Sequence, residues 1–329
     1  MERKRVRWGI IGCGKVCEVK SGPAFYKSPE SELVAVMRRN GELAADYARR
    51  HNVPKWYDDA DALIADPDVT AVYVATPPES HLRYAAAAMK AGKPVYVEKP
   101  MARNFSESLE MIEVSRRSGQ QLHVAYYRRA LPYFLKIKEL IDSGVIGKLL
   151  GVNLRYARCP RPGDDDPARK DWHVQPEISG GGYLIDTGSH QINLLQYYFG
   201  QVVDILPVAQ NLMGWYEPEE YVAAILLFKS GLTATCTWNY AASTHEEQDV
   251  VEISGRQGVI RFSVFRMDTI EVLSDTLTET IVIAPEVHVH YPMVQIVNNA
   301  ILNDCFHPAR TIDAAETARI IDRITKRQI

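Results

Sequence analysis

The sequence predicts an α/β protein with two parts: an N-terminal Rossmann domain built on a parallel sheet, and a C-terminal α+β domain with an open, mostly antiparallel sheet. Over about the first 126 residues, short apolar runs alternate with helical stretches, which is typical of βαβ units. Beyond that point, longer strand-like segments with glycine breaks follow one another. The length of 329 residues exceeds what one hydrophobic core usually serves, so two domains are expected.

The apolar runs of the first part are continuous rather than alternating, as is typical of parallel strands covered on both faces. The stretches between them repeat apolar residues at helical spacing, and two of them end near glycine, a common residue after a helix. The pattern predicts strands over residues 6–11, 33–37, 71–76, 94–98 and 121–126, and helices over 41–52, 79–93 and 106–120.

The second part begins with a predicted helix at 131–143 and a long strand at 148–158. A loop rich in proline, glycine and aspartate follows over 159–180, and then another helix. Glycine breaks such as KSGL and GRQG separate the later β segments, which indicates hairpins and a mostly antiparallel sheet. These segments are 202–212, 221–229, 232–240, 247–254, 258–265 and 268–274, and helices close the chain.

The composition and net charge exclude several classes of protein. Apolar residues make up 46% of the chain and charged residues 24%, which argues against a disordered or fibrous protein. The net charge of -3, from 38 basic and 41 acidic residues, gives no electrostatic footprint for nucleic acid or an anionic membrane, so a small-molecule partner is expected. The N-terminus lacks a signal-like apolar core and no run approaches the roughly 20 residues of a membrane span, so we expect a soluble, cytoplasmic protein.

The five cysteines form no CxxC pair, and their odd number and scatter suit reduced thiols. We therefore expect neither a disulfide framework nor a bound metal. They are Cys13, Cys17, Cys159, Cys236 and Cys305.

A glycine-rich turn directly follows the first predicted strand. In GIIGCGKVC (9–17) one glycine lets the chain turn, and a second lets the backbone approach a pyrophosphate at the start of a helix. Cys17 stands where a third glycine is usual, and a small residue there still lets the helix pack on the strand. The alternative is a tight turn without a ligand. The predicted dinucleotide contacts at this turn are Gly9, Gly12, Gly14, Lys15 and Val16.

The end of the second strand indicates which dinucleotide binds. An acidic residue there would bind the ribose hydroxyls and repel a 2′-phosphate, but the sequence runs AVMRRN. Arg38 and Arg39 are therefore placed to hold a phosphate by charge-assisted hydrogen bonds, which favours NADP over NAD. The alternative is that both are solvated surface charges.

Two further motifs carry chemistry. The strand PVYVE leads into EKP, which places Glu98, Lys99 and Pro100 at the edge where open α/β sheets bind ligands. The Lys99 ammonium there could donate to a substrate oxygen, and Pro100 could support a cis peptide.

In SGGGYLIDTGSH, Asp186 and His190 are four apart, a spacing that puts both on one face of a helix, where the carboxylate could orient the imidazole. The alternative for EKP is the end of a strand at the protein surface. The alternative for Asp186 and His190 is a pair with a structural role only.

GIIGCG, EKP and GGGYxxDxGSH in this order resemble the Gfo/Idh/MocA oxidoreductase family over nearly the whole chain. The resemblance implies a catalytic group of Lys99, Asp186 and His190, with His190 as acid and base. It also implies a Rossmann domain over 1–126 and a substrate-binding and oligomerisation domain over 127–308. The C-terminal helix, about 309–329, would pack back on the first domain, and the open sheet would form a homodimer or homotetramer.

The resemblance also implies further contacts to the cofactor and to the substrate. Arg38 departs from NAD-dependent relatives, which carry Asp there, and this supports NADP. Aromatic and polar side chains near the substrate suit sugar C–H faces and hydroxyls, although Tyr127 and Trp172 also fit core or hinge packing. The positions beside the cofactor are Thr76, Pro77, Pro78, His81 and Glu98, and the substrate candidates are Tyr127, Arg128, Trp172 and His173, together with Lys99, Asp186 and His190.

These observations predict reversible hydride transfer between NADP(H), or NAD(H), and a secondary alcohol or ketone of a sugar, cyclitol or related diol. One alternative is a non-catalytic nucleotide-binding regulator, against which the intact Lys99, Asp186 and His190 argue. Another is a glycosidase-like enzyme that keeps its NAD tightly bound and recycles the hydride.

Overall fold

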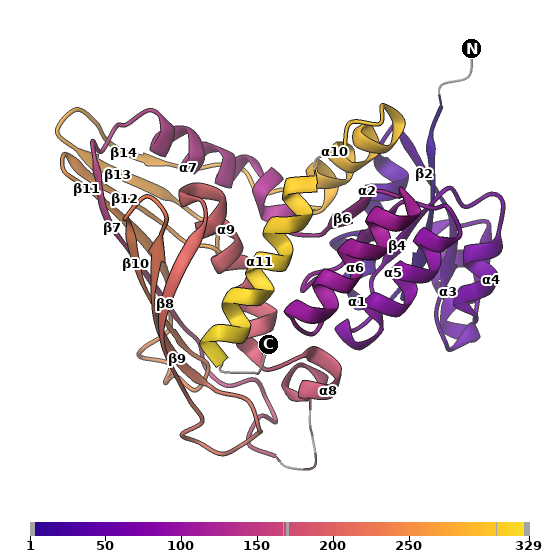
Figure 1. Cartoon of the computed structure of the whole chain (residues 1–329), viewed down its shortest axis with the longest axis horizontal. Coiled ribbons are helices and arrows are strands. Elements are labelled where there is room, and N and C mark those ends of the chain that lie inside the picture. The colour runs from indigo at the N-terminus through magenta and orange to yellow at the C-terminus, as the bar shows by residue number, and fades with distance from the viewer. Residues whose placement is uncertain (1–3, 167, 169–170, 307, 326–329) are drawn as a thin grey trace. The chain divides into compact units, whose positions relative to one another are not determined.

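The computed structural model describes residues 4–166, 168, 171–306 and 308–325. The chain forms two units, each with its own sheet (Figure 1). The first unit comprises Met1–Tyr127 and Glu286–Glu316, and the second Arg128–Pro285 and Thr317–Ile329. One sheet is parallel and the other is mixed and mostly antiparallel, which confirms the predicted fold class.

The first unit is built on six parallel strands in the order β3-β2-β1-β4-β5-β6. Because β1 lies between β2 and β4, the chain reverses its direction across the sheet at β1. The loop after β1 therefore opens at a switch point, where α/β sheets bind ligands. The strands are β1 (Val6–Ile11), β2 (Ser31–Met37), β3 (Lys55–Tyr57), β4 (Ala71–Val74), β5 (Val95–Val97) and β6 (Leu122–Val124).

Short polar side chains begin three helices of this unit. Asn40, Asp59 and Asn104 each accept a hydrogen bond from the backbone N–H three residues further on. Each bond satisfies a donor that has no partner inside its helix. The helical segments are α1 (Lys15–Val19), α2 (Gly22–Lys27), α3 (Gly41–His51), α4 (Ala60–Ala65), η1 (Pro78–Ser80), α5 (His81–Lys90), α6 (Phe105–Ser118) and α10 (Tyr291–Leu302).

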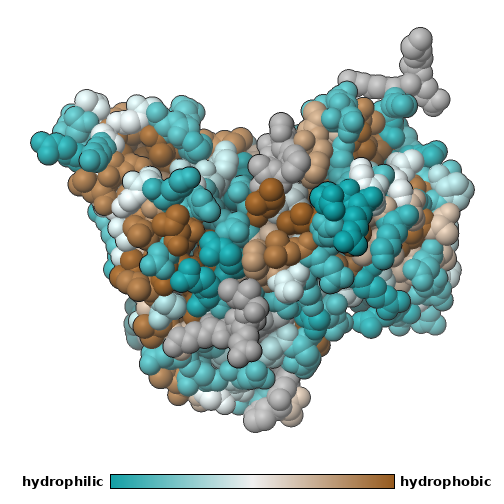
Figure 2. Space-filling model, viewed as in Figure 1, coloured by the Kyte–Doolittle hydropathy of each residue, from teal (hydrophilic) through white to brown (hydrophobic). Residues whose placement is uncertain are grey.

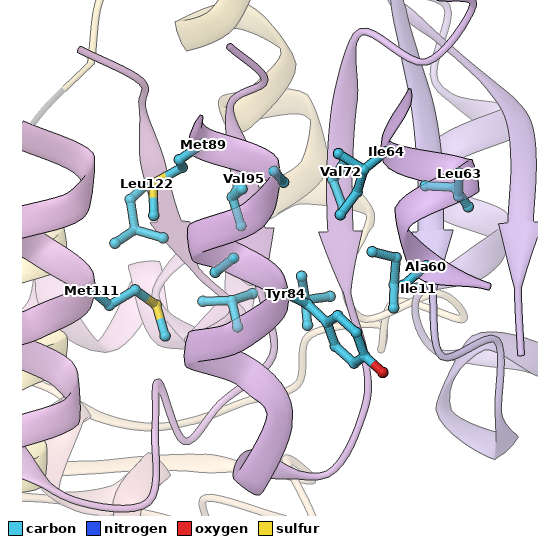
Figure 3. Packing of buried hydrophobic residues seen from close by; sticks show 14 of the residues in the cluster. Ile11, Ala60, Leu63, Ile64, Val72, Tyr84, Met89, Val95, Met111 and Leu122 are labelled. Atoms are coloured by element: carbon cyan, nitrogen blue, oxygen red, sulfur yellow. The ribbon is translucent and has the colours of Figure 1, made fainter. Parts of the chain in front are cut away.

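The hydrophobic core of the first unit packs helix side chains against one face of the sheet. Figure 3 shows Tyr84 and Met89 of α5 and Met111 of α6 among side chains from the strands, including Val72 and Val95. Ala314 and Ala315 of α11 (Pro308–Thr325) belong to the same cluster. Burying this much apolar surface stabilises the sheet edge that carries the glycine turn.

Aromatic side chains and α10 fill the other face. Trp8 of β1 packs against Phe25 and, edge-on, against Tyr96, and its indole N–H donates to Asn298 of α10 over 2.8 Å. Asn298 is fully buried, and its amide in turn donates to Ser31 and Ser28. Buried hydrogen bonds thus attach α10 to residues near the N-terminal end of the first unit.

The second unit contains an eight-stranded sheet in the order β14-β13-β12-β11-β7-β10-β9-β8. All neighbouring strands are antiparallel except β7 and β10. The strands are β7 (Leu149–Ala157), β8 (Val202–Gln210), β9 (Tyr221–Phe228), β10 (Thr233–Asn239), β11 (Gln248–Gly255), β12 (Gly258–Phe262), β13 (Ile270–Ser274) and β14 (Thr278–Ile281).

Helices α7 (Pro132–Asp142) and α9 (Ser189–Phe199) cover one face of this sheet (Figure 1). Trp238 of β10 is fully buried and donates to Gln191 of α9 over 2.7 Å, while Tyr198 of α9 donates to the Phe134 carbonyl of α7. Helix α11 runs from the first unit, which ends at Glu316, into the second. Shorter segments are η2 (Tyr127–Ala130), η3 (Trp172–Val174), α8 (Pro176–Ser179) and the π-helical η4 (Leu184–Gly188).

The other face of the second sheet keeps apolar side chains exposed. Leu206 and Val208 of β8 are 65% and 51% exposed, and Ile225 and Leu227 of β9 also lie open. Figure 2 shows apolar areas, coloured brown, among hydrophilic ones on the face of the molecule in view. No helix among the described residues is long and apolar enough to span a bilayer.

Candidate active site

The glycine turn after β1 fits closely between the ends of two neighbouring strands. Gly12 has a φ of +92°, and a Cβ on it would lie 2.8 Å from Thr76 Cγ2 and 2.9 Å from Thr76 N, so only glycine fits here. The backbone N–H groups of Gly12 and Cys13 both donate to the Met37 carbonyl at the end of β2. The turn is therefore fixed at the carboxyl edge of the sheet, beside Arg38 and Thr76.

The next glycine leaves the start of α1 open. A Cβ on Gly14 would meet no described atom nearer than the Gly12 carbonyl oxygen at 3.8 Å, so backbone on this side is accessible to a ligand. Lys15 is exposed and Val16 half-buried. Cys17, at the place of the usual third glycine, is fully buried, and burial raises the pKa of its thiol, so it serves packing rather than reactivity.

Two arginines follow the last residue of β2. The Arg38 backbone N–H donates to the Tyr57 carbonyl over 3.2 Å, which fixes the chain, while the side chain is half-buried and that of Arg39 is exposed. Within the described residues neither guanidinium forms an ion pair, unlike Arg49 and Arg50 of the following helix. Their positive charge lies beside the glycine turn without a carboxylate to neutralise it.

The loop after β4 is tied to the loop after β5 by His81. The buried imidazole faces the Thr76 carbonyl at 2.7 Å and the Pro100 carbonyl at 3.0 Å. Burial lowers the pKa of His81, although both carbonyls favour the charged ring. Ser80 donates to the Thr76 hydroxyl over 2.8 Å, and η1 begins at Pro78, next to Pro77. His81 thus holds two predicted ligand-binding loops together.

The EKP motif ends β5 with a cis Lys99–Pro100 peptide. Lys99 is half-buried, but Glu98 points into the unit, where one carboxylate oxygen accepts from the Tyr73 hydroxyl and the other from the Lys99 backbone N–H at 3.1 Å. Burial raises the pKa of Glu98, although the Tyr73 bond and the Lys99 charge act in the opposite direction. Glu98 is thus bound to groups of its own unit.

His290 is a member of this network that the motifs did not indicate. Its Nε2 lies 3.4 Å from Glu98 Oε1, its Nδ1 lies 3.3 Å from the Tyr96 hydroxyl, and the side chain is fully buried. The Tyr127 ring packs on it with centroids 4.3 Å apart, and Tyr127 is itself buried, in line with the core-packing alternative. No periodicity links His290 to EKP, so only the fold could bring them together.

In the second unit the glycine run leads into a π-helical turn rather than a regular helix. Asp186 lies in η4, and His190 lies in the first turn of α9. A Cβ on Gly182 would lie 2.6 Å from Pro218, and one on Gly188 2.6 Å from Leu184, so both glycines permit close packing. The four-residue spacing of Asp186 and His190 predicts one face of a regular α-helix, but the structure has a wider turn here, of a kind often found at functional sites.

Asp186 is surrounded by polar side chains from the preceding loop. Arg161 Nη2 lies 3.1 Å from Asp186 Oδ2, and His173 Nε2 lies 3.8 Å from the same oxygen. Both partners also face Asp171: His173 Nδ1 at 2.7 Å and Arg161 Nη1 at 3.3 Å. Burial favours protonation of Asp171, but bonds from the His173 ring and backbone N–H outweigh it, and the pKa of Asp171 is lowered. Sequence reasoning found His173 and Asp186 but missed Arg161 and Asp171.

The remaining substrate candidates differ in exposure. Trp172 is 37% exposed, and its ring stacks on His173 with centroids 3.8 Å apart. Arg128 is buried, donates to the Val264 carbonyl over 3.2 Å and stacks on Phe265. His190 is also buried, with its ring edge-on to Phe265 at 6.3 Å. Trp172 is therefore the more accessible aromatic ring.

The predicted catalytic residues belong to different units: Lys99 to the first, Asp186 and His190 to the second. Among the described residues, no group of three or more histidine, cysteine or acidic side chains is arranged to hold a metal ion.

Comparison with known families covers both units. Residues 6–126 match the oxidoreductase family with an NAD-binding Rossmann fold, and residues 134–261 match the GFO/IDH/MocA C-terminal domain. Together the two matches cover well over half of the chain.

Named relatives are similar to this chain over most of their length. The chain is 42% identical to Oxidoreductase P35 of Formosa agariphila over 97% of this chain and 98% of the relative. It is 32% identical to trans-1,2-dihydrobenzene-1,2-diol dehydrogenase of Mus musculus over 77% of this chain and 73% of the relative. A levoglucosan dehydrogenase in complex with NADH and levoglucosan shares the fold, with a TM-score of 0.85 and 24% identity over 98% of this chain and 97% of that one.

Proposed function

Because the chain belongs to the Gfo/Idh/MocA family of NAD(P)-dependent oxidoreductases, we propose that it transfers hydride reversibly between NADP(H) and a secondary alcohol or ketone of a sugar, cyclitol or related diol. The observation that carries the proposal is the Gly12 turn, which only glycine can form, at the switch point of the parallel sheet. Dehydrogenases of a sugar and of a diol among the relatives support the substrate class.

The residues at the turn suit a dinucleotide. Gly14 leaves backbone open where a pyrophosphate would lie, and the exposed Lys15 adds positive charge. The bound nicotinamide would supply the hydride acceptor or donor. We propose further contacts to the cofactor from Gly9, Val16, Thr76, Pro77, Pro78, His81 and Glu98.

A preference for NADP over NAD is the finer part of the proposal. Arg38 and Arg39 directly follow β2, where an acidic residue would bind a 2′-hydroxyl, and neither has an ion-pair partner among the described residues. Two guanidinium groups with this freedom suit a 2′-phosphate, which carries nearly two negative charges. Comparison of kcat/KM for NADP+ and NAD+ tests this part separately.

The proposed catalytic group is Lys99, Asp186 and His190. His190 would take a proton from the substrate hydroxyl during oxidation and return it during reduction. Lys99 would donate to the substrate oxygen and stabilise the negative charge that develops there. Asp186, held by Arg161, would provide a fixed negative charge beside this proton path. Each residue occupies the position that the family motif assigns to it.

Substrate contacts are proposed for Trp172 and His173, whose stacked rings present an exposed aromatic face suited to sugar C–H groups. Tyr127 and Arg128 are buried and remain weaker candidates. We further propose a cytoplasmic homodimer or homotetramer that covers the exposed Leu206 and Ile225 on the open sheet.

The test is a turnover assay of the purified protein with levoglucosan, myo-inositol and trans-1,2-dihydrobenzene-1,2-diol, each with NAD+ and NADP+. The expected result is net formation of reduced nicotinamide with at least one compound. A regulator would bind the nucleotide without turnover of any member of a wider sugar and diol panel. A hydride-recycling glycosidase would release product without net change in reduced nicotinamide, and either result would contradict the proposal.

A further inference from the structure

Four side chains of the second unit form a closed ring in which two carboxylates alternate with a guanidinium and an imidazole. We call it the Asp186 ring, and its members are Arg161, Asp171, His173 and Asp186. Arg161 bridges the two carboxylates with its two terminal nitrogens, at 3.3 Å and 3.1 Å. His173 bridges the same carboxylates with its two ring nitrogens, at 2.7 Å and 3.8 Å. Each member therefore contacts two others, and none can turn without breaking contacts on both sides.

The ring is partly buried, which gives its contacts more weight than ordinary surface ion pairs. The side chains of Arg161 and Asp171 are 33% and 34% exposed, and those of His173 and Asp186 are each 22% exposed. Attraction between such groups is less screened by water and salt than attraction at an open surface. A planar guanidinium also fixes the angle between the carboxylates that it bridges.

Further contacts hold Arg161 itself in place. Its guanidinium lies over the Tyr183 ring, 4.5 Å from the ring centroid, and its backbone N–H donates to Asp164 over 2.7 Å. Asp164 also accepts from the Tyr183 hydroxyl. Tyr183 immediately precedes the π-helical turn that carries Asp186. Arg161 is thus attached to the same turn twice, through Tyr183 and through Asp186.

We propose that Arg161, Asp171 and His173 are positioning residues, which hold the Asp186 carboxylate at a fixed orientation for the reaction. This inference rests on the proposed function of Asp186. It gives His173 a role as a support for Asp186 in addition to its proposed substrate contact, and it adds two residues that no motif contains. Small displacements of a catalytic group lower the rate strongly, so these three residues contribute to turnover by fixing the position of Asp186.

The test is a double-mutant cycle between Arg161→Gln and Asp186→Asn, measured with whichever compound of the panel the enzyme turns over. Arg161→Gln alone should lower kcat by roughly tenfold to a hundredfold and change KM less than about threefold. In the Asp186→Asn background the same substitution should change kcat less than about twofold, because the group that Arg161 positions is already lost. Asp171→Asn, which keeps the side-chain shape, should act in the same direction.

Two further variants complete the design. Arg161→Lys should recover only part of the lost kcat, because an ammonium does not bridge two carboxylates as a planar guanidinium does. Arg261→Gln, which removes the Arg261–Glu252 ion pair of β12 and β11 in the same unit, is the matched control and should keep wild-type kcat. Melting temperatures of all variants show whether each one folds.

Three results would overturn the inference: a folded Arg161→Gln variant with wild-type kcat, an equal loss in both backgrounds, or a loss confined to KM. The last would make Arg161 a direct substrate ligand. If the wild-type protein turns over no compound, the proposed function fails instead. The ring is then tested by the same cycle on melting temperature, where additive effects of Arg161→Gln and Asp186→Asn would contradict the contact.

Discussion

His290 Nε2 lies 3.4 Å from Glu98 Oε1 in the interior of the first unit, although the two residues are 192 positions apart in the sequence. Glu98 immediately precedes Lys99, and its other carboxylate oxygen accepts the Lys99 backbone N–H. The geometry of the proposed catalytic lysine thus depends on a buried carboxylate whose surroundings include an imidazole from the C-terminal segment. A buried titratable pair of this kind links the stability of the unit to pH.

The first prediction concerns that dependence. Burial raises the pKa of Glu98, so the folded chain holds this proton more tightly than the unfolded chain. The stabilising contribution is complete below the ordinary glutamate pKa of 4.5 and is lost as pH rises through the raised value. Glu98→Gln, which cannot ionise, should therefore show a shallower fall in melting temperature above that pH than the wild type.

Glu113→Gln is the control for this measurement, because α6 exposes Glu113 and two arginines lower its pKa to about 2. The stability that Glu113 contributes is present above the ordinary glutamate pKa and is lost only as pH falls towards 2. Its variant should therefore keep the wild-type slope above pH 4.5. Equal slopes for Glu98→Gln and the wild type would contradict the prediction.

The second prediction concerns the glycine turn. Gly12→Ala places a Cβ 2.8 Å from Thr76 in a backbone conformation that alanine avoids, so the free energy of unfolding should fall by several kcal/mol and nucleotide affinity should be lost. Gly92→Ala is the matched control, because Gly92 has a φ of +79° but nothing within 4 Å of the added atom. It should lose only about 1 kcal/mol from the backbone term. Denaturant unfolding and nucleotide titration measure both, and equal losses would show that the close approach to Thr76 is unimportant.

The third prediction concerns the choice of cofactor. Arg38→Asp should lower kcat/KM for NADP+ by about tenfold to a thousandfold and leave or improve that for NAD+, because a carboxylate repels the 2′-phosphate and binds the 2′-hydroxyl. Arg49→Asp reverses a highly exposed charge on the next helix and should leave the ratio of the two values unchanged. A wild-type preference for NAD+ that survives Arg38→Asp would refute NADP selectivity.

The fourth prediction concerns Lys99. Lys99→Met removes the ammonium but keeps much of the side-chain length, so kcat should fall at least about a hundredfold while the Kd for the nucleotide changes less than about threefold. Lys90→Met, at the exposed end of α5, is the control and should turn over normally. Near-normal turnover of the Lys99 variant would remove this residue from the proposed mechanism.

Sequence patterns predicted the strand at one edge of each sheet, β6 and β8, but missed the strand at the opposite edge. β1 occupies the predicted residues 6–11 because its apolar run is continuous. β3 and β14 went unpredicted: β3 has only three residues, and β14 has three exposed residues out of four. Each lies at the end of its sheet, so backbone pairing with one neighbour holds it. Such strands need no hydrophobic periodicity, and periodicity is the signal that sequence reasoning uses.

Some residues of the candidate site are indicated by local sequence motifs, and others are not. Gly12, Lys99 and Asp186 were predictable because each lies in a short motif beside a regular element. Arg161 lies in an irregular loop, and His290 reaches Glu98 only through the long-range contacts of α10 and the segment before it. Local patterns contain no information about such tertiary contacts, so the structure was needed to find them.

The π-helical turn at Leu184–Gly188 amounts to one residue more than a regular α-helix would hold over the same length. Deleting one residue there would restore uniform winding over about the same length, so the flanking residues would keep their orientation while the side chains inside the turn would change direction. Asp186 would then leave the side of the helix from which Arg161 and His173 reach it, while His190 stayed in place. Insertions and deletions in this short segment would therefore disconnect an acidic side chain from its supports without changing any amino acid that contacts it.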